Sequence, residues 1–341
     1  MITDLRSDTF TLPTDEMKKA IVNAKLGDDV FREDKSVIEL ENLISEMTGK
    51  ESALLVSSGT MGNLIALMVH CNRGSEVVLG DQSHIYYYEQ GGISSIASLI
   101  PKPLKNYEDG TIDIDDIENS LRDENIHFPE TKLICLESTH NRCNGSPLEL
   151  SYMERVYKLA KSKGLNIHLD GARIFNAISY LNVDLNQVFK FVDSGMICLS
   201  KGLGSPIGSL LVGSKEFITK ARRVRKVLGG GMRQAGVIAA PGIVSLKKIS
   251  KIIVDDNRRA LEIAKFVDSI NGFSVDLDLV KTNIFYIDTE ERLAEDVVKT
   301  LSENGIFSFS VGKHKIRFVT HYMIKDDNID HIKNVFFTVF G

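Results

Sequence analysis

Residues 166–173 read NIHLDGAR and residues 196–204 read MICLSKGLG, and each stretch joins a short apolar run to a charged residue beside glycine. Asp170 ends the first run and Lys201 follows the second. Short apolar runs that alternate with amphipathic segments are typical of a parallel sheet covered on both faces. Because ligands of such sheets bind at the carboxyl ends of the strands, we expect Asp170 and Lys201 to lie at one ligand-binding edge.

The same pattern recurs along the chain and predicts the fold class. Six apolar runs occupy residues 53–56, 76–79, 133–136, 166–169, 196–199 and 209–212. Helical patterns lie between several of them, such as residues 150–163, which Gly164 ends. The sequence therefore predicts an α/β fold with a mostly parallel sheet and helices on both faces.

The last ninety residues change character and predict a second, smaller α+β domain. Residues 283–287, 306–311 and 316–320 resemble strands, and residues 290–304 and 326–337 resemble helices. We expect an N-terminal segment over residues 1–45, a large domain over 46–252 and a small C-terminal domain over 253–341. The N-terminal segment, whose best helix is 36–47, is expected to pack on the small domain or on a neighbouring subunit.

Composition excludes several classes of protein. Of the 341 residues, 43% are hydrophobic and 26% charged, which is ample for a packed core. The net charge of −5 argues against non-specific nucleic-acid binding. The four cysteines are scattered, so neither a disulfide scaffold nor a metal site is expected. With no signal-like start and no membrane-length apolar run, we expect a cytoplasmic protein without a membrane partner.

Three strand ends carry groups that suit pyridoxal phosphate. Lys201 is either a solvated loop residue or an amine that forms a Schiff base with a carbonyl. Asp170 is either the ion-pair partner of Arg173 or the group that keeps a pyridine nitrogen protonated. Ser58, Gly59 and Thr60 precede a helical pattern, where free backbone N–H groups can seat a phosphate or merely form a cap. No P-loop and no GxGxxG fingerprint follows the first strand.

A basic segment offers further cations for an anion. Residues 222–226 read RRVRK, and residues 229–233 read GGGMR. For Arg222 and Arg223 we favour an ordinary solvated helix face. The triple glycine beside Lys226 and Arg233 suggests a backbone pressed against a ligand or a neighbouring chain, with both cations near a phosphate across a subunit boundary.

These residues belong to a set of motifs that resembles one family over nearly the whole chain. The motifs are LRSDT, GDDV, SSGTMGN, QSH, ESTHN, HLDGARIFNA, CLSKGLGSPIGSLLVG, RKVLGGGMRQAG and IRFVTH, in this order. Together they resemble the low-specificity L-threonine aldolase family. The resemblance implies the fold of the aspartate aminotransferases, known as fold type I of the pyridoxal phosphate enzymes. It also implies retro-aldol cleavage of L-threonine, L-allo-threonine and related β-hydroxy amino acids to glycine and an aldehyde.

The resemblance also implies roles for single residues and a homo-oligomer, a dimer or tetramer with shared active sites. Lys201 would carry the Schiff base and Asp170 would pair with the pyridine nitrogen. Gly59 and Thr60 would bind the phosphate, with Lys226 and Arg233 of a neighbouring subunit close by, and His84 would stack on the ring. Ser7, Arg173 and Arg317 would bind the substrate carboxylate. His127 would approach the substrate hydroxyl.

Several alternatives stay open at this point. The base for the β-hydroxyl is His84, His127 or an ordered water. Phe31 stands where the family commonly has Tyr, and Ile85 where it often has Asn, so the preferred substrate side chain is open. Rival enzymes on the same scaffold are a phenylserine aldolase, a β-eliminating lyase and an alanine racemase. A non-catalytic ligand-binding protein and a nucleotide-binding dehydrogenase are rivals of other classes.

Overall fold

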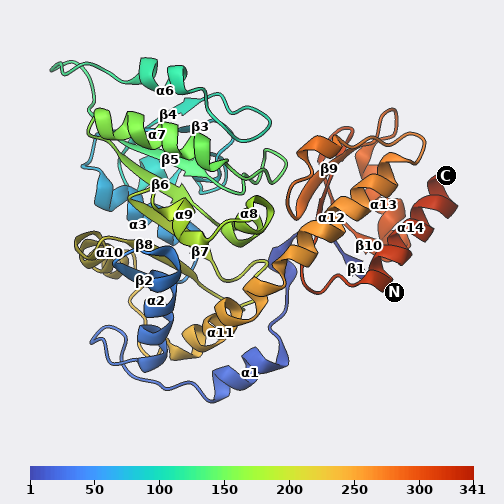
Figure 1. The fold of residues 1–341 in the computed structure, drawn as a ribbon, viewed down its shortest axis with the longest axis horizontal. Helices are drawn as coiled ribbons and strands as arrows, with labels where there is room; N and C mark the ends of the chain where they lie inside the picture. The colour runs from blue at the N-terminus through green and yellow to red at the C-terminus, as the bar shows by residue number, and fades with distance from the viewer.

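A seven-stranded sheet forms the centre of the large domain in the computed structural model, which describes all residues from 1 to 341 (Figure 1). Its strands, in spatial order, are β2 (Ser52–Val56), β8 (Ser209–Gly213), β7 (Ser194–Cys198), β6 (Asn166–Asp170), β5 (Thr131–Glu137), β3 (Glu76–Gly80) and β4 (Ile100–Leu104). Only β8 runs antiparallel to its neighbours, so six strands point the same way. The prediction of a mostly parallel sheet is confirmed.

One strand of the sheet, β4, was not predicted from the sequence. β4 reads IPKPL and lies at the edge of the sheet, beside β3 alone. Proline has no N–H for the sheet and is tolerated on edge strands. The two prolines and the partial exposure of this strand hide it from a search for apolar runs.

Helices cover both faces of the sheet (Figure 1). One face carries α2 (Lys35–Thr48), α6 (Ile114–Ser120), α7 (Leu150–Ser162), α8 (Ile174–Leu181), α9 (Leu185–Phe189) and α11 (Gly236–Lys247), and the other carries α3 (Gly59–His70), α4 (His84–Tyr87), α5 (Gly92–Ser95) and α10 (Lys215–Val227). Strand residues alternate between the two cores: Leu55 packs on the α2 side, whereas Leu54 and Val56 pack with α3 and α10. None of the helices combines the length and the apolar character that crossing a bilayer requires.

The small domain is built on two short sheets and three helices. β11 (Phe309–Gly312), β12 (Lys315–Val319) and β9 (Ile284–Asp288) form an antiparallel sheet. The expected single strand over 306–311 is interrupted at Ser308, because β10 (Ile306–Phe307) pairs with the N-terminal β1 (Thr3–Asp4) instead. The helices are α12 (Ile253–Asp268), α13 (Ala294–Glu303) and α14 (Asp326–Phe340). The domain boundaries expected from the sequence stay predictions.

The N-terminal segment contacts both domains: its beginning packs on the small domain, and its later part packs on the large domain. Leu5 belongs to the core of the small domain, and β1 completes the pair with β10. Further along, α1 (Asp15–Val22) packs against α11, and α2 packs against β2 (Figure 1). Asp34 caps α2 by accepting a hydrogen bond from the Val37 N–H, and Gly49 ends it in the left-handed conformation.

Two neighbouring phenylalanines of α14 provide a matched test of the small-domain core. Phe336 is fully buried against Phe273 and Phe318, whereas Phe337 is 68% exposed. We expect Phe336→Ala to lower the free energy of unfolding by about 3–5 kcal/mol, because it leaves a cavity. Phe337→Ala should change it by no more than about 0.5 kcal/mol. Urea unfolding of both variants measures the difference, and equal effects would contradict this assignment of the core.

Candidate active site

A cavity of about 410 Å³ opens at the carboxyl ends of the parallel strands. The large domain and the N-terminal segment contribute Ser7, Thr9, His84, Tyr88, Asn141, Arg173 and Lys201, and the small domain contributes Phe309, Ser310, Val311 and Arg317. The structure thus brings together Lys201, His84, Arg173, Ser7 and Arg317, all of which were predicted from the sequence.

Asp170 is the last residue of β6, and Lys201 follows β7, the adjacent parallel strand. In the pairing of β6 with β7, Asp170 lies opposite Met196, and Lys201 comes three residues after β7 ends. The Lys201 amine lines the cavity and forms no hydrogen bond or ion pair with another side chain. Asp170 is 2% exposed, and its carboxylate accepts hydrogen bonds from Asn63 Nδ2 at 2.8 Å and the Ala172 N–H at 3.1 Å. An unpaired amine and a buried, hydrogen-bonded carboxylate thus lie at the carboxyl ends of adjacent strands.

The start of α3 lies at the same edge, since β2 is parallel to β7. Ser58 caps the helix by accepting from the Met61 N–H. A Cβ at Gly59 would approach Cys198 Sγ and Met196 Cε to 3.0 Å, so this position favours glycine. Thr60 is exposed in the first turn. Free N–H groups and the helix dipole make this end of α3 suitable for an anion.

His84 begins α4, and two carboxylates hold it in place. Its backbone N–H donates to Glu137 Oε2 at 2.6 Å, and its ring Nδ1 lies 2.9 Å from Glu89 Oε1. Since a carboxylate accepts, Nδ1 carries the hydrogen and Nε2 is left for a ligand. Burial lowers the pKa of His84, but the hydrogen bond to Glu89 and the charge of Asp170 outweigh it and raise that pKa above its usual value.

Two arginines from different domains converge on Asn141. Arg173 forms a buried ion pair with Asp8, with both N···O distances at 2.7 Å. Asn141 Oδ1 accepts from Arg173 at 3.4 Å and from Arg317 at 3.3 Å. Burial, and next the positive charge of Arg173, lower the pKa of Arg317. Asp8 pairs with Arg173, whereas Arg317 has no ion-pair partner, so its positive charge suits the carboxylate of a ligand.

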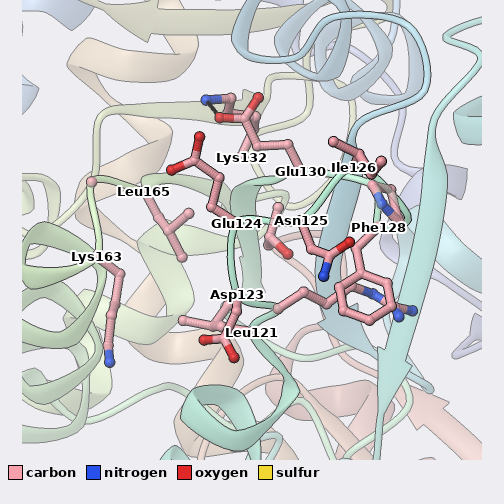
Figure 2. Close-up of a pocket in the computed structure, with 14 residues that line it drawn as sticks. Leu121, Asp123, Glu124, Asn125, Ile126, Phe128, Glu130, Lys132, Lys163 and Leu165 are labelled. Carbon is pink, nitrogen blue, oxygen red and sulfur yellow. Dashed lines mark hydrogen bonds and ion pairs between the residues drawn. The ribbon is translucent and has the colours of Figure 1, made fainter.

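The other predicted site residues lie outside the cavity of the single chain. Lys226 is exposed and packs over Gly231, and Arg233 pairs with Asp28 at 2.9 Å. His127 belongs to the exposed loop 121–130, where its N–H donates to Asn125. This loop lines a second cavity of about 560 Å³ (Figure 2). The cavity lies at the amino ends of β5 and β6, the opposite edge of the sheet from Asp170.

Other residues at the site were not identified from the sequence. Asp8, Asn63 and Glu89 are buried and hydrogen-bonded to the predicted site residues Arg173, Asp170 and His84, respectively. Asn63 and Asp8 lie within the motifs SSGTMGN and LRSDT, but nothing in the sequence marks Glu89 as their neighbour. The two departures from the family do not line the cavity: Phe31 is 70% exposed, and Ile85 is buried in the core beneath α4.

The chain is similar to known proteins over most of its length. The Beta-eliminating lyase family matches residues 4–290. A probable low-specificity L-threonine aldolase 2 of Arabidopsis thaliana is 46% identical over 99% of this chain and 97% of its own length. A low specificity L-threonine aldolase of Escherichia coli is 36% identical over 96% of both chains. The solved structure of a threonine aldolase from Leishmania major superposes with a TM-score of 0.86 at 19% identity, covering 99% of this chain and 100% of that one.

The Asp8–Arg173 pair predicts how stability responds to acid. Burial alone raises the pKa of Asp8, but Arg173 outweighs it and lowers that pKa from 3.8 to about 2. The contribution of Asp8 to stability is therefore present above pH 4 and is lost as the pH falls toward 2. We expect Asp8→Asn to lower the free energy of unfolding at pH 7 by about 3–5 kcal/mol, because Arg173 stays buried without a countercharge.

Urea unfolding between pH 7 and pH 2.5 measures both effects, with the exposed Asp15→Asn as the matched control. The acid-dependent loss should be smaller in Asp8→Asn than in the control. An unchanged pH dependence in Asp8→Asn would show that the ion pair does not couple Asp8 to folding.

Proposed function

The chain belongs to the beta-eliminating lyase family and, within it, to the low-specificity L-threonine aldolases, and from this membership we propose that it cleaves L-threonine and related β-hydroxy amino acids to glycine and an aldehyde. The observation that carries the proposal is that the unpaired Lys201 amine and the buried Asp170 carboxylate lie at the carboxyl ends of adjacent strands, at one edge of the parallel sheet. The enzyme would be a carbon–carbon lyase that uses pyridoxal 5′-phosphate.

The residues present fit this cofactor. Lys201 would bind its aldehyde as a Schiff base, Asp170 would face its pyridine nitrogen, and the start of α3 at Gly59 and Thr60 would seat its phosphate. Asp170 is buried and accepts two hydrogen bonds, as a carboxylate that faces a protonated ring nitrogen needs. When bound, the cofactor supplies an electron sink for the carbanion left by bond cleavage. We further propose that Lys226 and Arg233 reach the phosphate from a neighbouring subunit of a homo-oligomer.

Arg317 and Arg173 would bind the substrate carboxylate, with Ser7 beside them. Arg173 donates from Nε and from both Nη groups, whereas Arg317 donates only from its two Nη groups and its Nε has no partner. Arg317 therefore has more donors left for the substrate. Binding a carboxylate would also offset the mutual repulsion of the two guanidinium groups. Because one arginine comes from β12 and the other from the turn after β6, the substrate would be fixed between the two domains, which aligns the bond to be broken.

His84 is the group that we propose as the base for the β-hydroxyl. It lines the cavity, its Nδ1–H is held by Glu89, and Nε2 is free to accept a proton. The role expected for His127 at the substrate hydroxyl stays a prediction, since its loop lies away from the cavity of the single chain. Tyr88 and residues 309–311 line the cavity and would contact the substrate side chain.

Rival activities on the same scaffold differ in their products. A β-eliminating lyase would release ammonia, and an alanine racemase would invert the α-carbon without forming an aldehyde. A phenylserine aldolase would form benzaldehyde faster than acetaldehyde. Analysis of products from threonine, allo-threonine and phenylserine separates these activities.

The amine of Lys201 provides the first test. We expect Lys201→Ala to lose the yellow absorbance of covalently bound pyridoxal phosphate and to lower kcat for threonine cleavage by about 10³-fold or more. Lys220→Ala, on the exposed side of α10, is the matched control and should retain both. Full turnover by Lys201→Ala would refute the role of this amine.

The charge of Asp170 provides the second test. Asp170→Asn keeps the size of the side chain but removes the negative charge that would face the ring nitrogen. We expect kcat to fall by about 10²–10³-fold, with circular dichroism unchanged. The exposed Asp15→Asn serves again as control. If Asp170→Asn cleaves threonine at the wild-type rate, the electron-sink role is wrong.

A further inference from the structure

Glu89 has no role in the proposed chemistry, yet it lies buried between two groups that do. It follows α4 and is 6% exposed. Its Oε1 accepts from His84 Nδ1 at 2.9 Å and from Asn63 Nδ2 at 2.9 Å. One donor or acceptor atom each of His84, Glu89 and Asp170 lies within 4.8 Å of the others. Burying a carboxylate is unfavourable unless it is hydrogen-bonded, and these donors meet that need.

Asn63 links Glu89 to Asp170 through one amide group. It is fully buried in α3, and its Nδ2 lies 2.9 Å from Glu89 Oε1 and 2.8 Å from Asp170 Oδ2. The two N–H bonds of the amide therefore reach two different carboxylates. On its other side, Asn63 Oδ1 lies 3.0 Å from His168 Nε2. The opposite orientation of the amide would aim Oδ1 at both carboxylates, so the hydrogen bonds fix it.

From Asn63, a chain of hydrogen bonds continues away from the cavity, and each group in this chain donates toward Asn63. His168 Nδ1 lies 2.9 Å from Ser194 Oγ, which lies 2.7 Å from His70 Nε2. Burial lowers the pKa of His168 to about 3 and that of His70 to about 4, so both rings are neutral at pH 7. A neutral ring has one N–H. His168 must donate from Nε2 to Asn63, so its Nδ1 accepts from Ser194, whose oxygen accepts from His70.

This chain of neutral groups holds Asn63 in a single orientation beneath the site. Resting on the proposed function, we propose that Glu89 and Asn63 are positioning residues that tie the His84 ring to Asp170. Glu89 fixes the ring by its Nδ1–H, which leaves Nε2 as the proton acceptor, and Asn63 holds Glu89 and Asp170 at a fixed separation. The His84 ring and the Asp170 carboxylate would then keep a fixed position relative to each other.

The charges around His84 give this coupling a measurable consequence. Glu89 and Asp170 face its ring and raise its pKa, whereas burial and the Lys201 amine lower it. Glu137 contacts only the backbone N–H of His84. Burial, and then the charge of Asp170, also raise the pKa of Glu89 against the hydrogen bonds from His84 and Asn63. Removing the charge of Glu89 should thus make His84 a weaker base.

The variant Glu89→Gln tests the inference, because it keeps the shape and the acceptor oxygen and removes the charge. NMR of the protein labelled at the histidine ring carbons, with and without pyridoxal phosphate, reports the pKa of His84 directly. We expect that pKa to fall by about one unit or more. His84 accepts a proton only when neutral, so the acid limb of the kcat profile should shift to lower pH. The kcat on the plateau should fall about 10-fold, with little change in KM.

Two further variants separate positioning from a general loss of structure. Glu303→Gln, on the exposed end of α13, is the control and should leave the His84 titration and kcat unchanged. In a His84→Ala background, Glu89→Gln should cause no further loss of kcat, because Glu89 acts through His84. Asn63→Leu, similar in size, should lower kcat and shift the absorbance of the bound cofactor, since it removes donors from both carboxylates.

An unchanged His84 pKa in Glu89→Gln overturns the inference, and so does an additive loss of kcat in the His84→Ala background. Failure of the proposed function is distinguishable from either outcome. It would appear as full activity of Lys201→Ala, whereas the NMR titration without cofactor depends on neither cofactor binding nor turnover.

Discussion

The common direction of six strands is the constraint on which the rest of the molecule depends. Strands that run in parallel end at one edge, so side chains that are distant in the sequence meet there. The ends of β2, β3, β5, β6 and β7 supply Thr60, His84, Asn141, Asp170 and Lys201. Register matters as much as direction. A slip of one residue in β6 would turn Asp170 to the opposite face of the sheet, away from Asn63.

Buried charge makes the site dependent on the packing of the whole chain. Asp8 neutralises Arg173, although 165 residues separate them, and Arg317 enters from the small domain. An unpaired charge in such a place is strongly destabilising. Correct placement of the arginines therefore depends on the N-terminal segment being packed against both domains. In the structure β1 pairs with β10, and α2 packs on the large sheet.

The sequence predicted those features that follow from local pattern. Apolar runs located every strand of the large sheet except β4, because each lies in a buried position and β4 does not. Strand ends pointed to Asp170 and Lys201, and the family resemblance added Arg317 and Ser7. Glu89 could not be found in this way, because only its contacts to Asn63, 26 residues away, and to the His84 ring mark it as part of the site.

The distribution of charge also accounts for which bond the site can select. Positive charge gathers at Arg173 and Arg317, where a carboxylate would bind, and negative charge gathers at Asp170 and Glu89 on the side of the sheet where α3 and α4 pack. His84 lies between these regions with one nitrogen held and one free. A substrate held by its carboxylate at one end and its hydroxyl at the other would have little freedom to rotate about the bond between its amino nitrogen and its α-carbon. Fixing that rotation would align the bond between the α- and β-carbons for cleavage, in preference to loss of the α-proton, and it needs only rigid placement of groups that the fold already provides.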